Sequence, residues 1–365
     1  MKDIIVGISG GVDSAVTALL LKENGYNITG IHLNINGHTD PGIASIEKIR
    51  KILGINIIDL DVSKRFQNTV IQHFREEHLK GRSPSPCTVC NPGFKWQILI
   101  EHANLNGIKN VASGHYIQKV KRNGKWWLTK SVDSKKDQSY FLWGLRQEQI
   151  DRLCTPLGIK TKDEIKKIAR NNHLDFLIKK KESTGLCFAN GLTYVELLEK
   201  HIPEIKEITP GYVVDSGDNI IGRHRGYIYY TVGQKRGLSL YEDKGFCVTG
   251  INVGENKITA GSPRDLWKKV FYIHKCNFVD EGFAIKSSGL SVKIRGFGWN
   301  PKGTCEIQKE SQGIYKVSLE NPAWAPAPGQ PAVFYKDDLI VGGGIITTVN
   351  TVGHLVNIYG NKYGI

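Results

Sequence analysis

The strongest constraint on the fold is an alternation of short apolar runs with helical patterns over the first half of the chain. Three short runs rich in apolar residues are typical of buried parallel strands, 4–8, 28–33 and 55–60, and a fourth strand ending in Gly is expected at 111–115. Apolar residues recur at helical spacing between them, over 12–24, 43–53 and about 65–80. Prolines in the loop 82–87 keep it out of a helix. Repeated strand–helix–strand units predict an α/β fold built on a doubly wound parallel sheet.

The pattern changes near residue 205. From Pro210 onward, short segments rich in Val, Ile, Tyr and Thr alternate with Gly, Asp and Asn turns, which is typical of all-β structure. The expected strands are 227–232, 257–260, 290–294, 315–319, 332–335 and 340–346. A chain of 365 residues exceeds one ordinary domain. We therefore predict three domains: 1–205, the α/β domain; 206–275, a small mainly-β linking domain; and 276–365, a C-terminal β-barrel.

Composition restricts the partners and the compartment. The formal net charge of +14 favours a polyanionic partner, although a lysine-rich proteome would give the same excess. The seven cysteines are odd in number and scattered, unlike the disulfide framework of a secreted protein. The first residues enter a strand pattern without the apolar core of a signal peptide, and no apolar run reaches the about 20 residues that span a bilayer. We expect a cytoplasmic protein with no membrane association.

The most specific motif lies between the first strand and the first helix. It reads Gly7-Ile8-Ser9-Gly10-Gly11-Val12-Asp13-Ser14. Two glycines allow a tight turn whose N–H groups, with the positive end of the helix, suit a phosphate. Asp13 beside phosphates makes sense mainly if Mg²⁺ bridges them. No G-x-x-x-x-G-K-[ST] motif is present, and a Gly-Gly turn with an ordinary helix cap is the alternative interpretation.

The S-G-G-x-D-S pattern resembles the PP-loop of ATP pyrophosphatases, which cleave ATP between the α and β phosphates to adenylate an acceptor. Five further stretches closely resemble the bacterial tRNA-specific 2-thiouridylases, in the family's order and over the whole chain. They are Ser83-Pro84-Ser85-Pro86-Cys87-Thr88-Val89-Cys90-Asn91, Lys135-Lys136-Asp137-Gln138-Ser139-Tyr140-Phe141-Leu142, Lys181-Glu182-Ser183-Thr184-Gly185-Leu186-Cys187-Phe188, Tyr230-Thr231-Val232-Gly233-Gln234-Lys235-Arg236-Gly237-Leu238 and Pro328-Gly329-Gln330.

The resemblance implies an ATP-dependent transferase that adenylates C2 of the wobble uridine, position 34 of tRNA, and then replaces the oxygen with sulfur. The products would be 2-thiouridine, AMP and pyrophosphate. A thiolate is a natural carrier of a persulfide, and a second thiol can resolve the intermediate by forming a disulfide bond. By resemblance, Cys187 is the persulfide carrier and Cys90 its partner. Leu33 and Gly114 would complete the ATP site formed by residues 7–14, with Mg²⁺ on the phosphates.

The resemblance also implies a tRNA surface. Ser85, Pro86 and Cys87 would border the target base, which must be flipped out to react. Other matching contact positions are His115, Lys136, Asp137, Gln138, Arg295, Gly296 and Gln330. Members of the family often carry an aromatic residue where this chain has Gly296, so the departure puts the contact at this position in doubt. The implied partners are tRNAs for Lys, Glu and Gln, and a sulfur-carrier protein or cysteine desulfurase as persulfide donor.

Two further features suggest interactions. Lysines crowd a hairpin that turns at Asn123-Gly124 and carries Trp126 and Trp127, which suits RNA, although the tryptophans can equally pack inward. Cys87 stands where many family members carry Asp, a residue thought to help in acid/base work at the base. With Cys90 and Cys187 it could hold an iron–sulfur cluster, since zinc has no fourth ligand at a recognisable spacing. A redox-sensitive spare thiol is the alternative interpretation of Cys87. The remaining cysteines are expected to be structural: Cys154, Cys247, Cys276 and Cys305.

Two other functions remain open. A small-molecule PP-loop synthetase would need neither reactive cysteines nor a basic surface. A non-enzymatic RNA-binding or iron–sulfur protein with a degenerate loop would release no pyrophosphate in response to tRNA.

Overall fold

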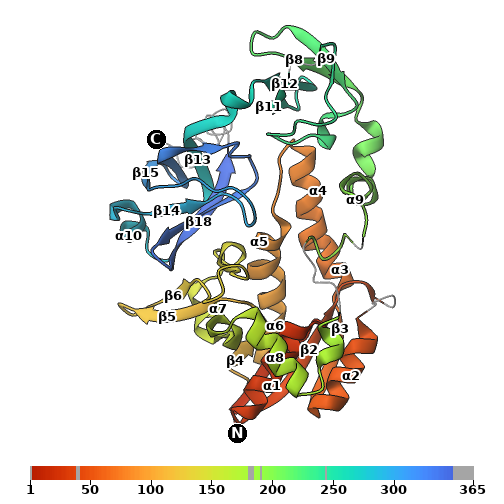
Figure 1. Cartoon of the computed structure of the whole chain (residues 1–365), viewed down its shortest axis with the longest axis vertical. Helices are drawn as coiled ribbons and strands as arrows, with labels where there is room; N and C mark the ends of the chain where they lie inside the picture. The colour runs from red at the N-terminus through yellow and green to blue at the C-terminus, as the bar shows by residue number, and fades with distance from the viewer. Residues whose placement is uncertain (1, 38–41, 180–184, 190, 243–244, 348–365) are drawn as a thin grey trace. The chain divides into compact units, whose positions relative to one another are not determined.

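The computed structural model describes residues 2–37, 42–179, 185–189, 191–242 and 245–347. The chain divides into two compact units (Figure 1). The first unit holds residues up to 70, 87–184 and 338–340; the second holds 71–86, 185–337 and the residues from 341 on. Residues 181–184 of one motif and 348–365 of the predicted third domain lie outside the described residues. The described helices include none that is long and apolar enough to cross a membrane.

The first unit contains the predicted parallel sheet. Its order is β3-β2-β1-β4-β7, and all neighbouring strands are parallel. The strands are β1 (Lys2–Gly7), β2 (Tyr26–Asn34), β3 (Asn56–Asp61), β4 (Asn110–Ala112) and β7 (Leu153–Cys154). The chain adds β2 and β3 on one side of β1 and then β4 and β7 on the other. The winding therefore reverses between β1 and β4, the position where open α/β sheets bind ligands.

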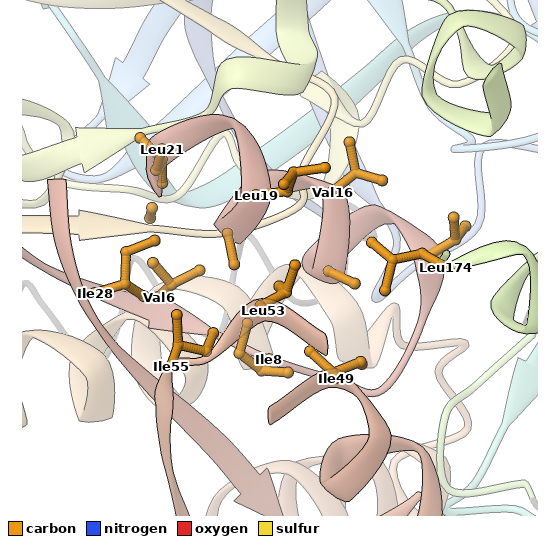
Figure 2. Close-up of a cluster of buried hydrophobic side chains, with 14 of the residues drawn as sticks. Val6, Ile8, Val16, Leu19, Leu21, Ile28, Ile49, Leu53, Ile55 and Leu174 are labelled. Atoms are coloured by element: carbon orange, nitrogen blue, oxygen red, sulfur yellow. The ribbon is translucent and has the colours of Figure 1, made fainter. Parts of the chain in front are cut away.

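Helices pack on this sheet through one apolar core. The helices of the unit are α1 (Val12–Glu23), α2 (Ile43–Leu53), α3 (Ser63–Phe66), α5 (Pro86–Cys90), α6 (Trp96–Leu105), α7 (Gln147–Arg152) and α8 (Lys162–Asn171). Gly54, at φ +57°, ends α2 as the sequence predicts. Figure 2 shows the core between β1, α1 and α2, where Val6, Val16 and Ile49 are fully buried. This burial fixes the start of α1 against the end of β1.

One local prediction is confirmed and another is wrong in part. The helix expected over about 65–80 is confirmed, because α3, a π-helical turn at Gln67–Ile71 and α4 (Gln72–Leu79) follow one another without a gap in the sequence. The loop expected over 82–87 ends in helix α5, which begins at Pro86, so Cys87 and Cys90 lie on a helix rather than in a loop. Proline fits the first helical turn because the N–H that it lacks has no partner there.

The second unit is mainly antiparallel β-structure, as predicted, with α4, α9 (Tyr194–His201) and α10 (Glu281–Lys286). One sheet runs β10-β9-β8-β12-β11, with β8 (Gly211–Val214), β9 (Ile220–His224), β10 (Ser239–Leu240), β11 (Cys247–Asn252) and β12 (Lys257–Gly261). Another includes β14-β17-β18-β13-β16-β15. Its strands are β13 (Trp267–Phe278), β14 (Ser291–Lys293), β15 (Cys305–Ser311), β16 (Ile314–Trp324), β17 (Pro331–Lys336) and β18 (Leu339–Thr347).

The strand expected over 227–232 is wrong. Residues Tyr227–Tyr229 form a 3₁₀ turn instead, after Gly226 at φ +139°. The β-propensity of tyrosine is overridden because Tyr227 and Ile228 are both buried, whereas a half-exposed strand would bury alternate residues.

Candidate functional site

The glycine-rich loop joins β1 to α1 in a turn held by its own serines. The backbone N–H of Ser9 donates to Ser14 Oγ at 3.1 Å, and Ser14 Oγ donates to the Gly11 carbonyl at 3.0 Å. Gly10 sits at φ +74°. No side chain caps the start of α1. The first amides of α1 therefore suit an anionic ligand, supported by the helix dipole.

Gly114 approaches this loop from the strand across the reversal point. A Cβ atom at Gly114 would lie 2.8 Å from both Asp13 C and Ser14 N. These are backbone atoms in the first turn of a packed helix, so moving them away would cost considerable free energy. Only glycine lets the segment after β4 approach the loop this closely. Leu33, the other ATP-site residue predicted outside the loop, lies in β2 and is half-buried.

Asp13 is held by two partners that the sequence analysis missed. Lys162 Nζ donates to its two carboxylate oxygens at 2.7 and 2.8 Å, and Tyr116 Oη donates to Oδ1 at 2.8 Å. The Lys162 side chain is only 8% exposed, against 34% for Asp13. A buried ammonium is retained only when it is paired, so the two side chains form one electrostatic unit.

Local sequence explains how Lys162 reaches that place. Thr161 caps α8, and the Glu164 carboxylate accepts a hydrogen bond from the Thr161 backbone N–H at 2.6 Å. This capping box fixes the first turn of α8, whose Ile165 is fully buried in the core. Thr161 and Glu164 were a readable helix-start signal. Nothing in the sequence indicated that Lys162 faces a carboxylate almost 150 positions earlier.

The same interactions extend to the predicted tRNA-contacting motif. Gln138 Oε1 accepts from the Tyr116 N–H at 2.9 Å. Asp133 Oδ2 accepts from the Lys162 N–H at 2.9 Å, and its Oδ1 accepts from the Lys136 N–H at 3.3 Å. The Asp137 carboxylate accepts from the Ser139 hydroxyl and from the N–H groups of Ser131 and Ser139. Asp137 therefore orders its own segment, and Gln138 connects that segment to Tyr116, which contacts Asp13 at the glycine-rich loop. A contact of Asp137 or Gln138 with RNA stays a prediction.

His115 is buried, with 8% of its surface exposed. Its Nδ1 lies 2.6 Å from Ser113 Oγ, and its ring lies 5.9 Å from that of Trp96. Burial, with a smaller contribution from the charge of Lys95, holds the pKa of His115 well below its usual value. The imidazole is therefore neutral at physiological pH, and its predicted RNA contact is not an electrostatic one.

The two predicted reactive cysteines lie in different units. Cys90 is buried at the end of α5, where the following Asn91 donates to the Cys87 carbonyl at 3.0 Å. Cys187 is exposed, whereas Phe188 is buried against Phe74 and His201, with ring centroids 5.6 and 5.5 Å away. A buried anchor therefore presents the neighbouring thiol at the surface.

Burial keeps the thiols of the other cysteines protonated. Burial raises the pKa of Cys154 and Cys247, and it raises the pKa of Cys276 and Cys305 to about 12. Groups of three or more His, Cys, Asp or Glu side chains that could hold a metal are absent from the described residues. The iron–sulfur hypothesis for Cys87, Cys90 and Cys187 stays a prediction.

Three of the resemblance motifs meet in the second unit. Gln330 Nε2 donates to the carbonyls of Ser83 and Pro84 at 2.5 and 3.2 Å, and the Ser83 hydroxyl contacts that of Thr231. The Ser83 N–H donates to the Pro328 carbonyl at 2.9 Å. The side chain of Gln330 therefore shapes the loop that ends at half-buried Ser85 and buried Pro86.

The basic hairpin forms as predicted, with β5 (Gln118–Arg122) and β6 (Lys125–Thr129) joined at Asn123 and Gly124. Trp127 is buried, at 7% exposure. Trp126 lies under Lys119 and donates to Asp151 at 2.8 Å. Lys119 itself donates to the carbonyls of Ile150 and Asp151. Lys119 and Trp126 of this basic hairpin therefore make contacts within the protein.

These features define an α/β nucleotide-binding domain of the PP-loop class followed by β domains. Family models match in the same order: the tRNA methyl transferase HUP domain over residues 2–191, the tRNA methyl transferase PRC-barrel domain over 196–262 and the aminomethyltransferase β-barrel domain over 268–346. The tRNA-specific 2-thiouridylase MnmA 1 of Bacteroides fragilis is 36% identical over 95% of this chain and 97% of its own length. That of Chlorobium phaeobacteroides is 35% identical over 96% and 99%.

The chain belongs to the tRNA-specific 2-thiouridylase family. Among solved structures, the U34-tRNA thiolase NcsA from Methanococcus maripaludis matches with 22% identity and a TM-score of 0.35, covering 56% of this chain and 68% of that one. A 4-thiouridine synthetase in complex with RNA and ATP matches with 15% identity and a TM-score of 0.38, covering 56% and 51%.

Proposed function

We propose that this protein is a tRNA-uridine 2-sulfurtransferase that converts the wobble uridine, position 34, into 2-thiouridine at the expense of ATP. The observation that carries the proposal is the match to 2-thiouridylases over nearly the whole of both chains. The geometry of the two units adds a phosphate-binding loop and an exposed thiol, which are the two parts that the reaction needs.

The first step activates a poor leaving group. The C2 carbonyl oxygen of the uridine attacks the α-phosphorus of ATP, and pyrophosphate leaves. The amides at the start of α1 hold the phosphates, and Lys162 offsets the negative charge that the phosphates and Asp13 bring together. Because Gly114 has no Cβ, the segment after β4 can approach the backbone of Asp13 and Ser14 closely. Mg²⁺ fits only as an ion shared with ATP, because Asp13 is a single carboxylate, and it would neutralise the phosphate oxygens.

The second step transfers sulfur. The terminal sulfur of a persulfide on Cys187 attacks C2, and AMP leaves with the original oxygen. The thiolate of Cys90 then attacks the Cys187 sulfur, which leaves 2-thiouridine on the tRNA and a disulfide between the two cysteines. A cellular thiol reductant restores both thiols. Exposure of Cys187 supports its loading by a separate sulfur-carrier protein or cysteine desulfurase.

We propose tRNAs for Lys, Glu and Gln as substrates, the cytoplasm as the site of action, and contacts with the substrate from Ser85, Pro86 and Cys87. The net charge of +14 supports a nucleic-acid substrate. The family descriptions mention methyl transfer, but an ATP-type loop together with an exposed thiol supports sulfur transfer instead.

The test is a reconstituted reaction. The protein is incubated with unmodified tRNA, ATP, Mg²⁺ and a persulfide donor, and the nucleosides are analysed by mass spectrometry. We expect 2-thiouridine, with no product when ATP is omitted. A matched reaction receives S-adenosylmethionine in place of ATP and the sulfur donor; a methylated nucleoside there, without 2-thiouridine in the first reaction, would replace the proposal by methyl transfer. A tRNA-independent adenylation of a small acceptor would favour the synthetase alternative.

A further inference from the structure

Three large aromatic side chains are exposed at one part of the second unit. Phe297 is 71% exposed, Trp299 59% and Trp267 42%. The rings of Trp267 and Trp299 meet edge to face, with centroids 5.5 Å apart. We refer to these three residues as the aromatic patch. Single exposed apolar residues are common on protein surfaces, but grouped large rings indicate a binding surface.

The backbone beneath the patch is held rigidly. Arg295 donates to the carbonyls of Trp299, Trp324 and Ala325 at 3.3, 3.0 and 2.8 Å. Asn300 Oδ1 accepts from the N–H groups of Ile294 and Arg295 at 2.7 and 3.0 Å. The loop 295–300 is therefore fixed by polar contacts while its aromatic rings remain exposed. Arg295 supports the loop and has its guanidinium committed to carbonyls. Fixing the loop in advance reduces the entropy lost on binding.

The charge around the patch identifies the kind of partner. Residues 267–302 contain seven Lys or Arg and two Asp or Glu. Lys268, Lys269 and Lys302 are exposed, and no ion pair is found for them within the part of the chain that the structure describes. Exposed rings that are close in sequence to exposed lysines suit an unpaired nucleobase with its flanking phosphates. An acidic protein surface would match the lysines but would leave the exposed aromatic rings without a stacking partner.

We propose that the aromatic patch stacks on unpaired bases of the RNA substrate, with Lys268, Lys269 and Lys302 near the adjacent phosphates. This inference rests on the proposed function and adds a contact that depends on Phe297 and Trp299, not on Gly296, which has no side chain to stack. The patch lies in the second unit, outside the nucleotide loop, so it contributes to tRNA affinity and not to adenylation chemistry.

The experiment measures tRNA affinity by fluorescence anisotropy over a series of salt concentrations. The variants are Phe297→Ser, Trp299→Ser, the pair Lys268→Gln/Lys269→Gln, and Tyr241→Ser as a matched control, since Tyr241 is an aromatic residue that is 66% exposed. We expect each patch variant to bind about tenfold more weakly, with an unchanged salt dependence, because stacking involves no charge. The lysine pair should lower the slope of log K against log salt by up to about 2. Tyr241→Ser should bind like the wild type.

Circular dichroism checks that the variants fold, and Phe297→Ser removes a ring that is not itself a member of the Trp267–Trp299 pair. Affinities of both ring variants within twofold of the control would overturn the inference. Unchanged tRNA affinity combined with slower sulfur uptake from the persulfide donor would also overturn it, because the patch would then bind a protein. Failure of the wild type to bind tRNA at all would instead defeat the proposed function, so the two failures are distinguishable.

Discussion

The ion pair between Lys162 and Asp13 gives the sharpest prediction for the nucleotide site. In Lys162→Met, the carboxylate loses a partner that reaches both of its oxygens at 2.7 and 2.8 Å and retains the Tyr116 hydroxyl. A hydrogen bond to a charged group contributes about 1.5–3 kcal/mol. Because Asp13 is 34% exposed, water can partly replace the ammonium, so we take the lower end, about 1.5–2 kcal/mol.

This magnitude translates into rate. We expect kcat/KM for tRNA-dependent adenylation to fall roughly 10- to 30-fold in Lys162→Met. The assay is exchange of labelled pyrophosphate into ATP in the presence of tRNA, which needs no sulfur donor. Lys167→Met is the matched control, since Lys167 is an exposed lysine of the same helix, and it should exchange at the wild-type rate. Lys162→Arg keeps the charge and should recover part of the loss.

A double-mutant cycle tests whether the pair acts as a unit. Asp13→Asn and Lys162→Met should be non-additive by about 1–2 kcal/mol in the free energy of activation, because the residues are in direct contact. Two results would refute the reasoning: exchange by Lys162→Met within twofold of Lys167→Met, or additivity of the two substitutions. Retained tRNA affinity in each variant shows that the fold is intact.

Three other predictions follow from the described geometry. Gly114→Ala forces a Cβ to 2.8 Å from two backbone atoms, so calorimetry should show ATP affinity lowered about tenfold or more, whereas Gly93→Ala, in open space, should bind normally. Cys187→Ser should abolish 2-thiouridine formation but leave pyrophosphate exchange within a fewfold; equal loss of both would contradict a role confined to sulfur transfer. Burial lowers the pKa of His78 and His274 to about 4, so unfolding should bind protons between pH 6.5 and 4. Stability measured by urea denaturation should therefore fall over that range, by at most roughly 3 kcal/mol per histidine, and a stability independent of pH there would contradict the burial argument.

Much of the nucleotide domain could be predicted from the sequence because its signals are local. The Gly10-Gly11 turn follows an apolar strand run directly, and helical spacing ends at Gly54, so β1, α1 and α2 were all readable. The family of the chain was equally readable, because the motifs occur in one order. These features depend on neighbouring residues, which periodicity and turn chemistry describe well.

The missed features depend on contacts between distant residues. The pairing of Lys162 with Asp13, and of Gln330 with the carbonyls of Ser83 and Pro84, joins segments without any periodic signature. The strand expected at 227–232 failed for a related reason: tertiary burial of consecutive residues overrode local propensity.

The central claim is that the C2 oxygen of the wobble uridine is adenylated and leaves as part of AMP. The direct test uses tRNA carrying oxygen-18 at C2 of uridine 34, with ATP, Mg²⁺ and a persulfide donor. Mass spectrometry of the nucleotide products should find the heavy oxygen in the phosphate of AMP, in an amount equal to the 2-thiouridine formed. Unlabelled AMP, with the heavy isotope recovered in water or in inorganic phosphate, would contradict the account.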